Sequence, residues 1–180
     1  TKTRQQLEEQ VLPGYIAAQR WYGAKGEPLR CARLADHVLW KPGGGEWMLA
    51  VIDVESGETN RTTAPYFVPL ALDWEDQGDT RAREASTAVV ARARQQASVG
   101  TLSDGMSDPA FARSIVKAIG QGGELATASG RIRFVPTDAY TRLAGEGIDD
   151  LAVSPPLALS SNTVVTLGER LFLKGYRRLR

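Results

Sequence analysis

The first part of the chain changes from a helical to an extended pattern of apolar residues. Leu7, Val11 and Leu12 share one side of a helix, which predicts a helix over residues 3–12. Pro13 is expected to end it, because proline lacks the N–H group that a helix interior requires. Dense apolar runs follow, each bounded by turn-forming residues, and they predict three β-strands. The runs cover residues 28–40, 46–54 and 64–72.

The predicted strands differ in how well they suit the interior of a sheet. Residues 46–54 are apolar on both faces, so this strand is expected at the centre of the sheet. Pro65 and Pro69 interrupt the next strand. Because proline cannot donate a hydrogen bond to a neighbouring strand, these prolines place residues 64–72 towards an edge.

Residues 86–104 fit two different structures. Their alanine and arginine content suits a helix, whereas Val89, Val90 and the Gln-Gln-Ala-Ser sequence that follows suit two strands with a turn between them. We predict a hairpin for this segment.

The clearest helical signal lies over residues 109–119. Asp108 is a suitable N-cap, Pro109 occupies the first helical position, and Gly120 is expected to end the helix. An apolar stripe runs along one face of this helix, which indicates that the face is buried. The stripe consists of Phe111, Ile115, Val116 and Ile119.

The remaining residues predict short elements. Residues 130–136 alternate like a strand, and residues 138–144 suit a short helix capped by Thr137. Two apolar runs on either side of Gly168 and Glu169 then predict a hairpin. Its strands are residues 164–167 and 171–176.

Composition indicates a globular chain and offers few catalytic groups. Of the 180 residues, 42% are hydrophobic and 24% are charged, and the net charge of +1 gives no general reason to expect nucleic-acid or membrane binding. Cys31 is the single cysteine, which favours the reducing cytoplasm, and with the lone His37 it supplies no metal site. Any Ser-His-Asp or Cys-His site would have to use His37. The glycines after residue 119 lack the Gly-Lys-Ser/Thr of a phosphate-binding loop.

The order of the predicted elements indicates an α+β fold in two parts. Residues 73–84 are the most polar stretch of the chain and are therefore the expected boundary. We predict an α+β front part over residues 1–85 and an α+β rear part over residues 86–180.

The segment "RWYGAKG" offers a candidate binding corner. Arg20, Trp21, Tyr22 and Lys25 would combine aromatic faces with cations if all four were exposed. The alternative is structural: the aromatic residues lie at the end of a helix and anchor it on the sheet, and the glycines allow the chain to turn. From this segment alone, we favour the structural interpretation.

The final predicted hairpin carries the spacing most typical of catalytic machinery. Strand alternation places Phe172, Lys174 and Tyr176 on one face of the second strand. The polar corner "SSNT" just upstream offers backbone N–H groups and hydroxyls to an anion. A phosphate-covering turn followed by a strand that carries a lysine is the layout of a kinase N-lobe. A lysine on an ordinary solvent-facing strand would give the same pattern.

Several segments resemble the N-terminal region of bacterial maltokinases, including those fused to trehalose synthase. The similar segments are "LPGYIAAQRWYGAKGEPL", "YFVPLAL", "LSDGMSDPAFARSIVKAI" and "SSNTVVTLGERLFLKGYRRLR". Maltokinases are kinases like the aminoglycoside phosphotransferases, and they transfer the γ-phosphate of ATP to maltose to give maltose 1-phosphate. The resemblance implies a cystatin-like cap, in which a curved antiparallel sheet packs on a helix, over residues 1–85. It implies an intermediate part of the kinase N-lobe over residues 86–180.

The resemblance also implies roles for single residues. Ser161, Asn162 and Thr163 match the family's phosphate loop, and Lys174 matches the strand lysine that pairs with ATP phosphates. The chain departs from the family's usual residues near both motifs. The departures are Ser160 in place of Gln, Val164 in place of a second Ser, and Gly175 in place of a bulky residue.

The catalytic aspartate and the Mg²⁺ ligands of this family lie in the C-lobe, which follows the region described here. We therefore expect these 180 residues to be non-catalytic alone and to need that C-lobe as a partner, because phosphoryl transfer depends on metal-assisted charge stabilisation. ATP and Mg²⁺ are the expected cofactors of the intact enzyme, and no cofactor is expected on these residues alone. An alternative function is docking on trehalose synthase, or oligomerisation, through the "RWYGAKG" segment.

Overall fold

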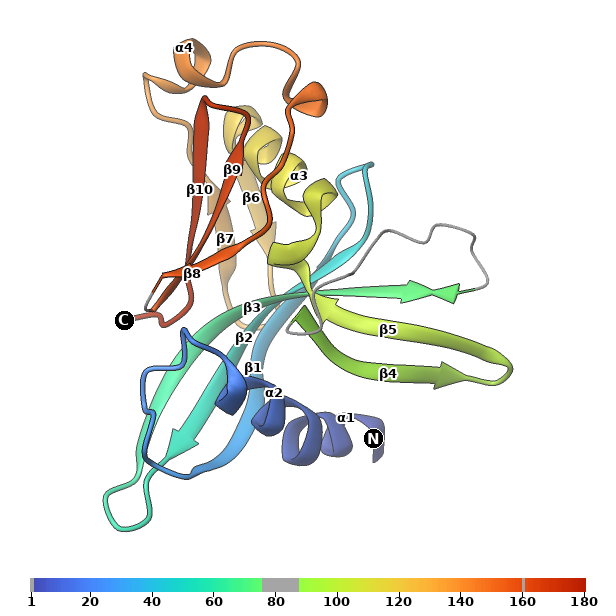
Figure 1. Cartoon of the computed structure of the whole chain (residues 1–180), viewed down its shortest axis with the longest axis vertical. Coiled ribbons are helices and arrows are strands. Elements are labelled where there is room, and N and C mark those ends of the chain that lie inside the picture. The colour runs from blue at the N-terminus through green and yellow to red at the C-terminus, as the bar shows by residue number, and fades with distance from the viewer. Residues whose placement is uncertain (1, 76–87, 160) are drawn as a thin grey trace.

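The computed structural model describes residues 2–75, 88–159 and 161–180. The chain begins with one continuous helical segment, which consists of α1 (Lys2–Gln6), the π-helical turn η1 (Leu7–Val11) and α2 (Leu12–Ala18) (Figure 1). The prediction that Pro13 ends the helix is wrong. Pro13 lies in the first turn of α2, directly after the π-turn has changed the hydrogen-bond pattern, so its missing N–H is tolerated there.

Five antiparallel strands form the main sheet, in the order β1-β2-β3-β5-β4. The predicted strands are confirmed. Strand β2 pairs with a neighbour on each side, but the central position expected for it belongs to β3. Leu12, Tyr15 and Ile16 of α2 pack on one face of the sheet, where they share a core with Ile52 and Val68. The strand bounds are β1 (Leu29–Trp40), β2 (Trp47–Ser56), β3 (Thr62–Trp74), β4 (Val89–Gln95) and β5 (Ser98–Asp104).

The edge position expected for residues 64–72 is wrong, because β3 is the central strand of the sheet. Strand β5 pairs only with Leu70–Trp74 of β3, so the earlier half of β3 has no β5 neighbour. Leu179 N–H donates to the carbonyl of Pro65 on this side. Since the N and C=O of one strand residue point to the same side, the nitrogens of Pro65 and Pro69 face away from β2 and cost no ladder hydrogen bond there.

The hairpin predicted for residues 86–104 is confirmed as β4 and β5. Gln95 lies opposite Ser98, and Gln96 adopts a positive φ of 54° in the two-residue turn. Strand β5 pairs in turn with β3, so the hairpin completes the main sheet. Residues 76–87 lie outside the described residues, and the division of the chain at residue 85 stays a prediction.

Side chains of the helical segment form hydrogen bonds with β1 at a bulge between Leu34 and Asp36. The Leu34 N–H donates to Glu8 Oε1 over 2.9 Å, and Arg4 Nη2 donates to the Leu34 carbonyl over 2.7 Å. Arg4 Nε also donates to Glu8 over 3.0 Å. A β-bulge leaves one residue out of the ladder, and here side chains of the helix satisfy the backbone next to it.

The predicted helix after Asp108 is confirmed as α3 (Pro109–Gln121), and the Asp108 carboxylate accepts from the Ala110 N–H. The helix ends at Gly122, with a φ of 70°, and the expectation that Gly120 ends it is wrong. Gly120 stays helical, and a Cβ there would overlap the ring of Tyr140. The need for glycine at this position therefore comes from packing between helices.

Short elements cover the other side of α3. The predicted strand near residues 130–136 is confirmed as β7 (Arg131–Phe134), and β6 (Gly123–Ala126) pairs with it, in a stretch where only a helix stop was expected. Helix α4 (Tyr140–Ala144) is also confirmed, but its N-cap is Ala139 and not Thr137. Two 3-10 turns complete this part, η4 (Gly105–Ser107) and η5 (Ile148–Asp150).

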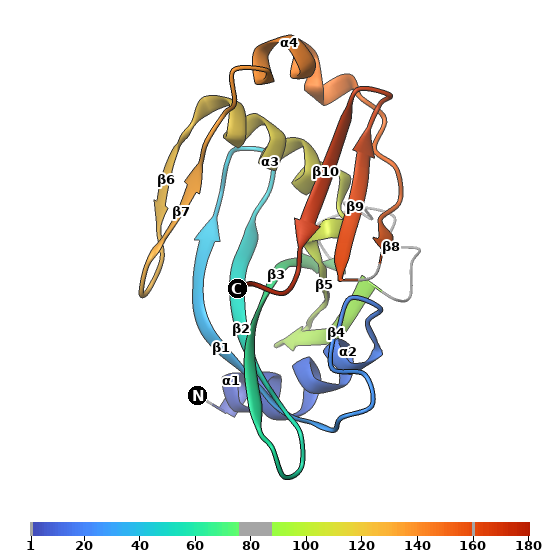
Figure 2. The same ribbon diagram turned by 90° about the vertical axis from the view of Figure 1, so that its left-hand side faces the viewer.

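A second, three-stranded sheet lies beside α3, in the order β10-β9-β8 (Figure 2). It consists of β8 (Leu157–Leu159), β9 (Asn162–Leu167) and β10 (Leu171–Tyr176), and the predicted hairpin of β9 and β10 is confirmed. A second core, which includes Trp47, Phe111 and Val165, joins this sheet and α3 to one end of the main sheet. None of the helices in the described residues has the length and hydrophobicity that a membrane-spanning helix needs.

Candidate functional site

The exposed face of β10 carries the candidate lysine. Phe172, Lys174 and Tyr176 alternate with the half-buried Leu171 and Leu173, as predicted. Phe172 is 79% exposed and Tyr176 is 60% exposed, which is unusual for aromatic side chains. The Lys174 Nζ lies 4.8 Å from the centre of the Tyr176 ring. In the described residues, no carboxylate lies within ion-pair distance of Lys174, so its ammonium group is available to an anion.

The structure places only Ser161 of the candidate loop in the turn before β9, whereas Asn162 and Thr163 are the first residues of β9 itself. Asn162 lies opposite Tyr176, and Thr163 lies opposite Gly175. Residues directly opposite each other in antiparallel strands point to the same side, so Asn162 shares the exposed face with Tyr176 and Lys174. Ser161 is exposed. The Thr163 side chain is buried on the other face of the sheet, and its backbone lies in the middle strand, between Ala158 and Gly175.

The "RWYGAKG" segment is not the exposed aromatic patch of the first interpretation. Trp21 and Tyr22 are buried in the core of the main sheet, and their ring centres lie 5.8 and 6.0 Å from that of Tyr66. For these two residues the structural interpretation is correct, because both rings pack against the sheet and anchor the chain after α2. Arg20 and Lys25 remain exposed.

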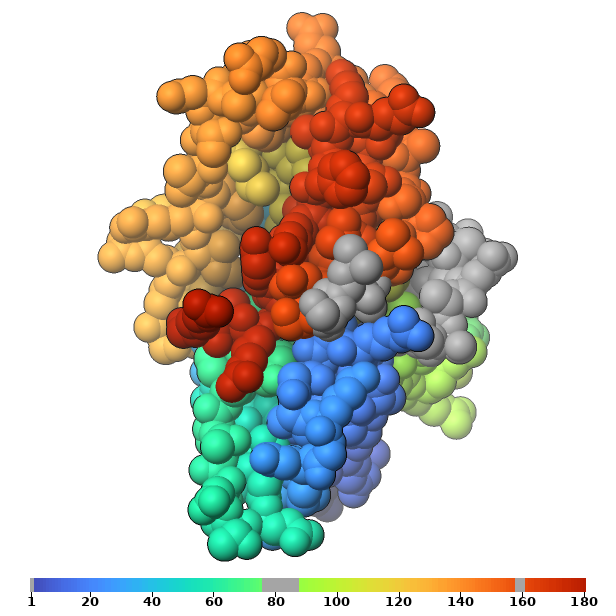
Figure 3. All heavy atoms as spheres, turned by 60° about the vertical axis from the view of Figure 1, so that its left-hand side comes forward, coloured from blue at the N-terminus to red at the C-terminus, as the bar shows by residue number. Residues whose placement is uncertain are grey.

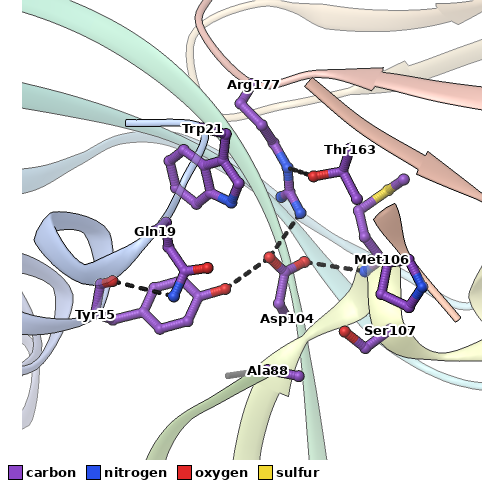
Figure 4. A pocket seen from close by; sticks show the side chains of 10 residues that line it. Tyr15, Gln19, Trp21, Ala88, Asp104, Met106, Ser107, Thr163 and Arg177 are labelled. Atoms are coloured by element: carbon purple, nitrogen blue, oxygen red, sulfur yellow. Dashed lines mark hydrogen bonds and ion pairs between the residues drawn. The ribbon is translucent and has the colours of Figure 1, made fainter. Parts of the chain in front are cut away.

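A buried ion pair joins the last residue of β5, Asp104, to Arg177, which follows directly on β10 (Figure 4). Arg177 Nη2 lies 2.7 Å from Asp104 Oδ2, and the two residues are 2% and 3% exposed. Arg177 Nε donates to Thr163 Oγ1 over 2.9 Å, and the guanidinium carbon lies 5.0 Å from the centre of the Trp21 ring. Asp104 Oδ2 also accepts from the Tyr15 hydroxyl over 2.7 Å. The pair is thus surrounded by partners from separate parts of the chain.

The protonation of Tyr15 suits this arrangement. Burial raises the pKa of Tyr15 far above its usual 10, and the adjacent charge of Asp104 raises it further. The hydroxyl therefore stays protonated and donates to Asp104. The other carboxylate oxygen, Oδ1, accepts from the Met106 N–H over 3.0 Å, so both oxygens of Asp104 are satisfied.

Sequence reasoning missed this pair. In the sequence, Arg177 is one of several basic residues near the end of the chain, and Asp104 is only the end of a predicted strand. A local signal existed for Arg177: it continues the alternation of the preceding strand on the side of Leu171 and Leu173, which faces away from Lys174. The partner could not be found locally, since 73 residues separate Arg177 from Asp104.

A family model for the maltokinase N-terminal cap domain matches residues 15–108. The match covers more than half of the chain. This chain belongs to the maltokinase N-terminal cap domain family. No curated protein matches the chain.

The matched residues locate the cap within the fold. They run from Tyr15 in α2 to Asp108, the N-cap of α3, and so include all five strands of the main sheet. Asp104 belongs to the matched cap, whereas Thr163, Lys174 and Arg177 lie beyond it. The buried pair therefore connects the maltokinase cap to the sheet that carries the candidate lysine.

A small pocket opens beside the buried pair and is lined in part by Gln19, Trp21 and Pro156. Its volume is about 80 Å³. Sites for drug-sized ligands usually measure roughly 300–1,000 Å³, so this pocket suits a few water molecules and neither a disaccharide nor a nucleotide. Within the described residues, no group of three or more His, Cys, Asp or Glu side chains could hold a metal ion.

Proposed function

We propose that the maltokinase whose N-terminal region is this chain transfers the γ-phosphate of ATP to maltose and produces maltose 1-phosphate. Such a reaction would serve trehalose, glycogen and other α-glucan metabolism in the cytoplasm. The proposal builds on membership of the maltokinase cap family. The observation that supports it most is that Asn162 and Lys174 lie on the same face of the three-stranded sheet, and that Asn162 directly follows the short connection from β8 to β9.

We propose further that Ser161, Asn162, Thr163 and Lys174 hold the phosphates of ATP. A kinase N-lobe of this layout covers the phosphates with backbone N–H groups and pairs them with the strand lysine. The exposed face fits this role, because Lys174 has no carboxylate partner among the described residues. The exposed aromatic rings of Phe172 and Tyr176 flank it on the same strand.

In this proposal the present residues bind and orient ATP, and they do not perform the transfer alone. The C-lobe supplies the catalytic aspartate and the ligands of Mg²⁺, and Mg²⁺ neutralises charge on the phosphates during transfer. In this proposal the cap supplies no catalytic group, and its buried carboxylates have structural partners. The Asp104 carboxylate, for example, is fully used by Tyr15, Met106 and Arg177.

The role of Lys174 is tested by Lys174→Met in the full-length enzyme. A hydrogen bond to a charged group contributes about 1.5–3 kcal/mol, so the variant should bind ATP roughly 10- to 100-fold more weakly in isothermal titration calorimetry. Lys25→Met is the matched control, because Lys25 is an exposed lysine of the cap and should leave ATP affinity unchanged. Equal ATP affinity of Lys174→Met and the wild type would contradict the assignment.

A second proposed function is docking on trehalose synthase, or self-association, through the exposed cations of the "RWYGAKG" segment. The observation in its favour is that Arg20 and Lys25 stay exposed while the aromatic residues between them are buried. Capture of trehalose synthase by the full-length protein should be lost in the double variant Arg20→Ala/Lys25→Ala. Unchanged capture, or no capture by the wild type, would argue against this function.

A further inference from the structure

Arg177 lies where the second sheet joins the cap. It follows directly on β10, and the Phe67 N–H of β3 donates to its carbonyl over 2.7 Å. Two residues later, the Leu179 N–H donates to the carbonyl of Pro65 over 2.9 Å. The end of the chain thus runs along the free side of β3, and Figure 3 shows the last residues, in red, against the green strands of the cap.

The Arg177 side chain connects three separate parts of the chain. Its guanidinium group contacts Asp104 at the end of β5, Thr163 at the start of β9 and the ring of Trp21 after α2. A guanidinium group is planar and rigid, so bonds from Nε and Nη2 fix the positions of both partners relative to each other. Thr163 is therefore held at a defined place relative to the cap.

Asp104 restrains the second sheet by another route as well. Its Oδ1 accepts from the Met106 N–H and so shapes the turn η4. The Met106 side chain packs on Gly175 of β10, where a Cβ would come within 3.0 Å of Met106 Cε. Gly175 is next to Lys174, so the position of the β10 backbone at the lysine depends on η4. Glycine here permits the close approach that a larger residue would prevent.

We propose that Asp104 and Arg177 are positioning residues for the ATP-phosphate site, through which the cap sets the affinity for ATP. The inference rests on the proposed function of Asn162, Thr163 and Lys174. Neither residue touches ATP in this proposal. The pair holds the start of β9 and the end of β10, which carry the loop and the lysine, in the relative position that binds the phosphates.

The test is the effect of Asp104→Asn on the steady-state kinetics of the full-length enzyme. The variant keeps the shape of the side chain but removes the charge that holds Arg177. We expect the KM for ATP to rise about tenfold while kcat changes less than twofold, since the reacting groups themselves are intact. Backbone amide exchange at residues 161–163 should also accelerate, because the loop loses its anchor.

Val54→Ala is the control for a general loss of stability. Val54 is buried in the core of the cap, and its truncation should lower the melting temperature without changing the KM for ATP. If Asp104→Asn does not fold, Tyr15→Phe removes only the donor to Asp104 and should raise the KM about two- to threefold.

The possible failures can be told apart. A wild-type enzyme that neither binds ATP nor forms maltose 1-phosphate would overturn the proposed function and, with it, the role of the pair. An active wild type whose folded Asp104→Asn variant keeps the same KM for ATP would overturn the positioning role alone. An equal rise in the KM for ATP in Val54→Ala would also overturn the positioning role, because the rise would then result from a general loss of stability.

Discussion

The Asp104–Arg177 pair should dominate the stability of the contact between the cap and the second sheet. Both side chains are almost fully buried, with exposed fractions of 4% and 2%. Removing one member of a buried pair leaves the other charge without its main partner, which costs about 3–5 kcal/mol. For a chain of this size, 1 kcal/mol corresponds to about 2–4 °C, so each single variant should melt roughly 6–20 °C lower.

A double-mutant cycle of Asp104→Asn and Arg177→Met isolates the interaction. After Asp104→Asn, the amide oxygen can still accept a hydrogen bond from the Tyr15 hydroxyl or the Met106 N–H, and Arg177→Met removes the remaining buried charge. The double variant should therefore cost about as much as one single variant, which gives a coupling energy of roughly 3 kcal/mol. The loss in free energy of unfolding of the double variant should therefore be smaller than the sum of the losses of the two single variants.

Urea unfolding, followed by tryptophan fluorescence, measures all four proteins of the cycle. Trp21 lies against the guanidinium group and reports on the contact itself. A coupling energy near zero, with fully additive single costs, would refute the reasoning. Single costs below about 0.5 kcal/mol would do so too, because they are typical of exposed ion pairs.

Further predictions concern two glycines and the N-terminal helical segment. In Gly14→Ala, the new Cβ in α2 meets no atom within 4 Å, so the variant should raise the free energy of unfolding by up to about 1 kcal/mol. Gly120→Ala should lower the free energy of unfolding by about 1–3 kcal/mol, because its new Cβ overlaps the ring of Tyr140. Urea unfolding measures both variants, and a gain in stability at both sites would contradict the packing role of Gly120. Burial opposes the charge of Glu8, but the Leu34 N–H and nearby arginines outweigh it and lower the pKa of Glu8 below 4.5. The folded state therefore binds the proton less readily than the unfolded state, and this stabilisation is present above about pH 4.5 and lost as the pH falls through the folded pKa. The stability difference between wild type and Glu8→Gln should shrink from pH 6 to pH 3, and a constant difference would contradict this.

Elements with a strong local pattern could be predicted from the sequence. The strands β1, β2 and β3 are dense apolar runs between turn residues, and β4–β5 and β9–β10 alternate on each side of a short turn. The α3 helix has its own cap and first-turn proline. In each case the residues that decide the structure are neighbours in the sequence, so the pattern is sufficient.

Features that depend on distant residues could not be predicted in this way. Pro65 predicts an edge, but only the tertiary pairing shows that β5 leaves that part of β3 free. Trp21 fits either an exposed or an anchoring role until its contact with Tyr66 is known. The pairing of Asp104 with Arg177 has no local signal, because it is created by the packing of β5 against the end of β10.

The candidate phosphate site was partly accessible from the sequence. Strand alternation correctly placed Lys174 on one face with Phe172 and Tyr176. The sequence did not indicate that the Thr163 hydroxyl turns to the opposite face, where it accepts a hydrogen bond from Arg177. The partner on that face, Arg177, is held by Asp104 of the cap, and the sequence of β9 alone does not reveal this contact.

The measurement that tests the account most directly is product analysis of the full-length enzyme with ATP, Mg²⁺ and maltose. The account predicts that ³¹P NMR detects maltose 1-phosphate formed in step with ADP, and that Lys174→Met lowers the ATP affinity at least about tenfold. ADP formation that does not depend on maltose, or a wild type that yields no sugar phosphate, would contradict the central claim.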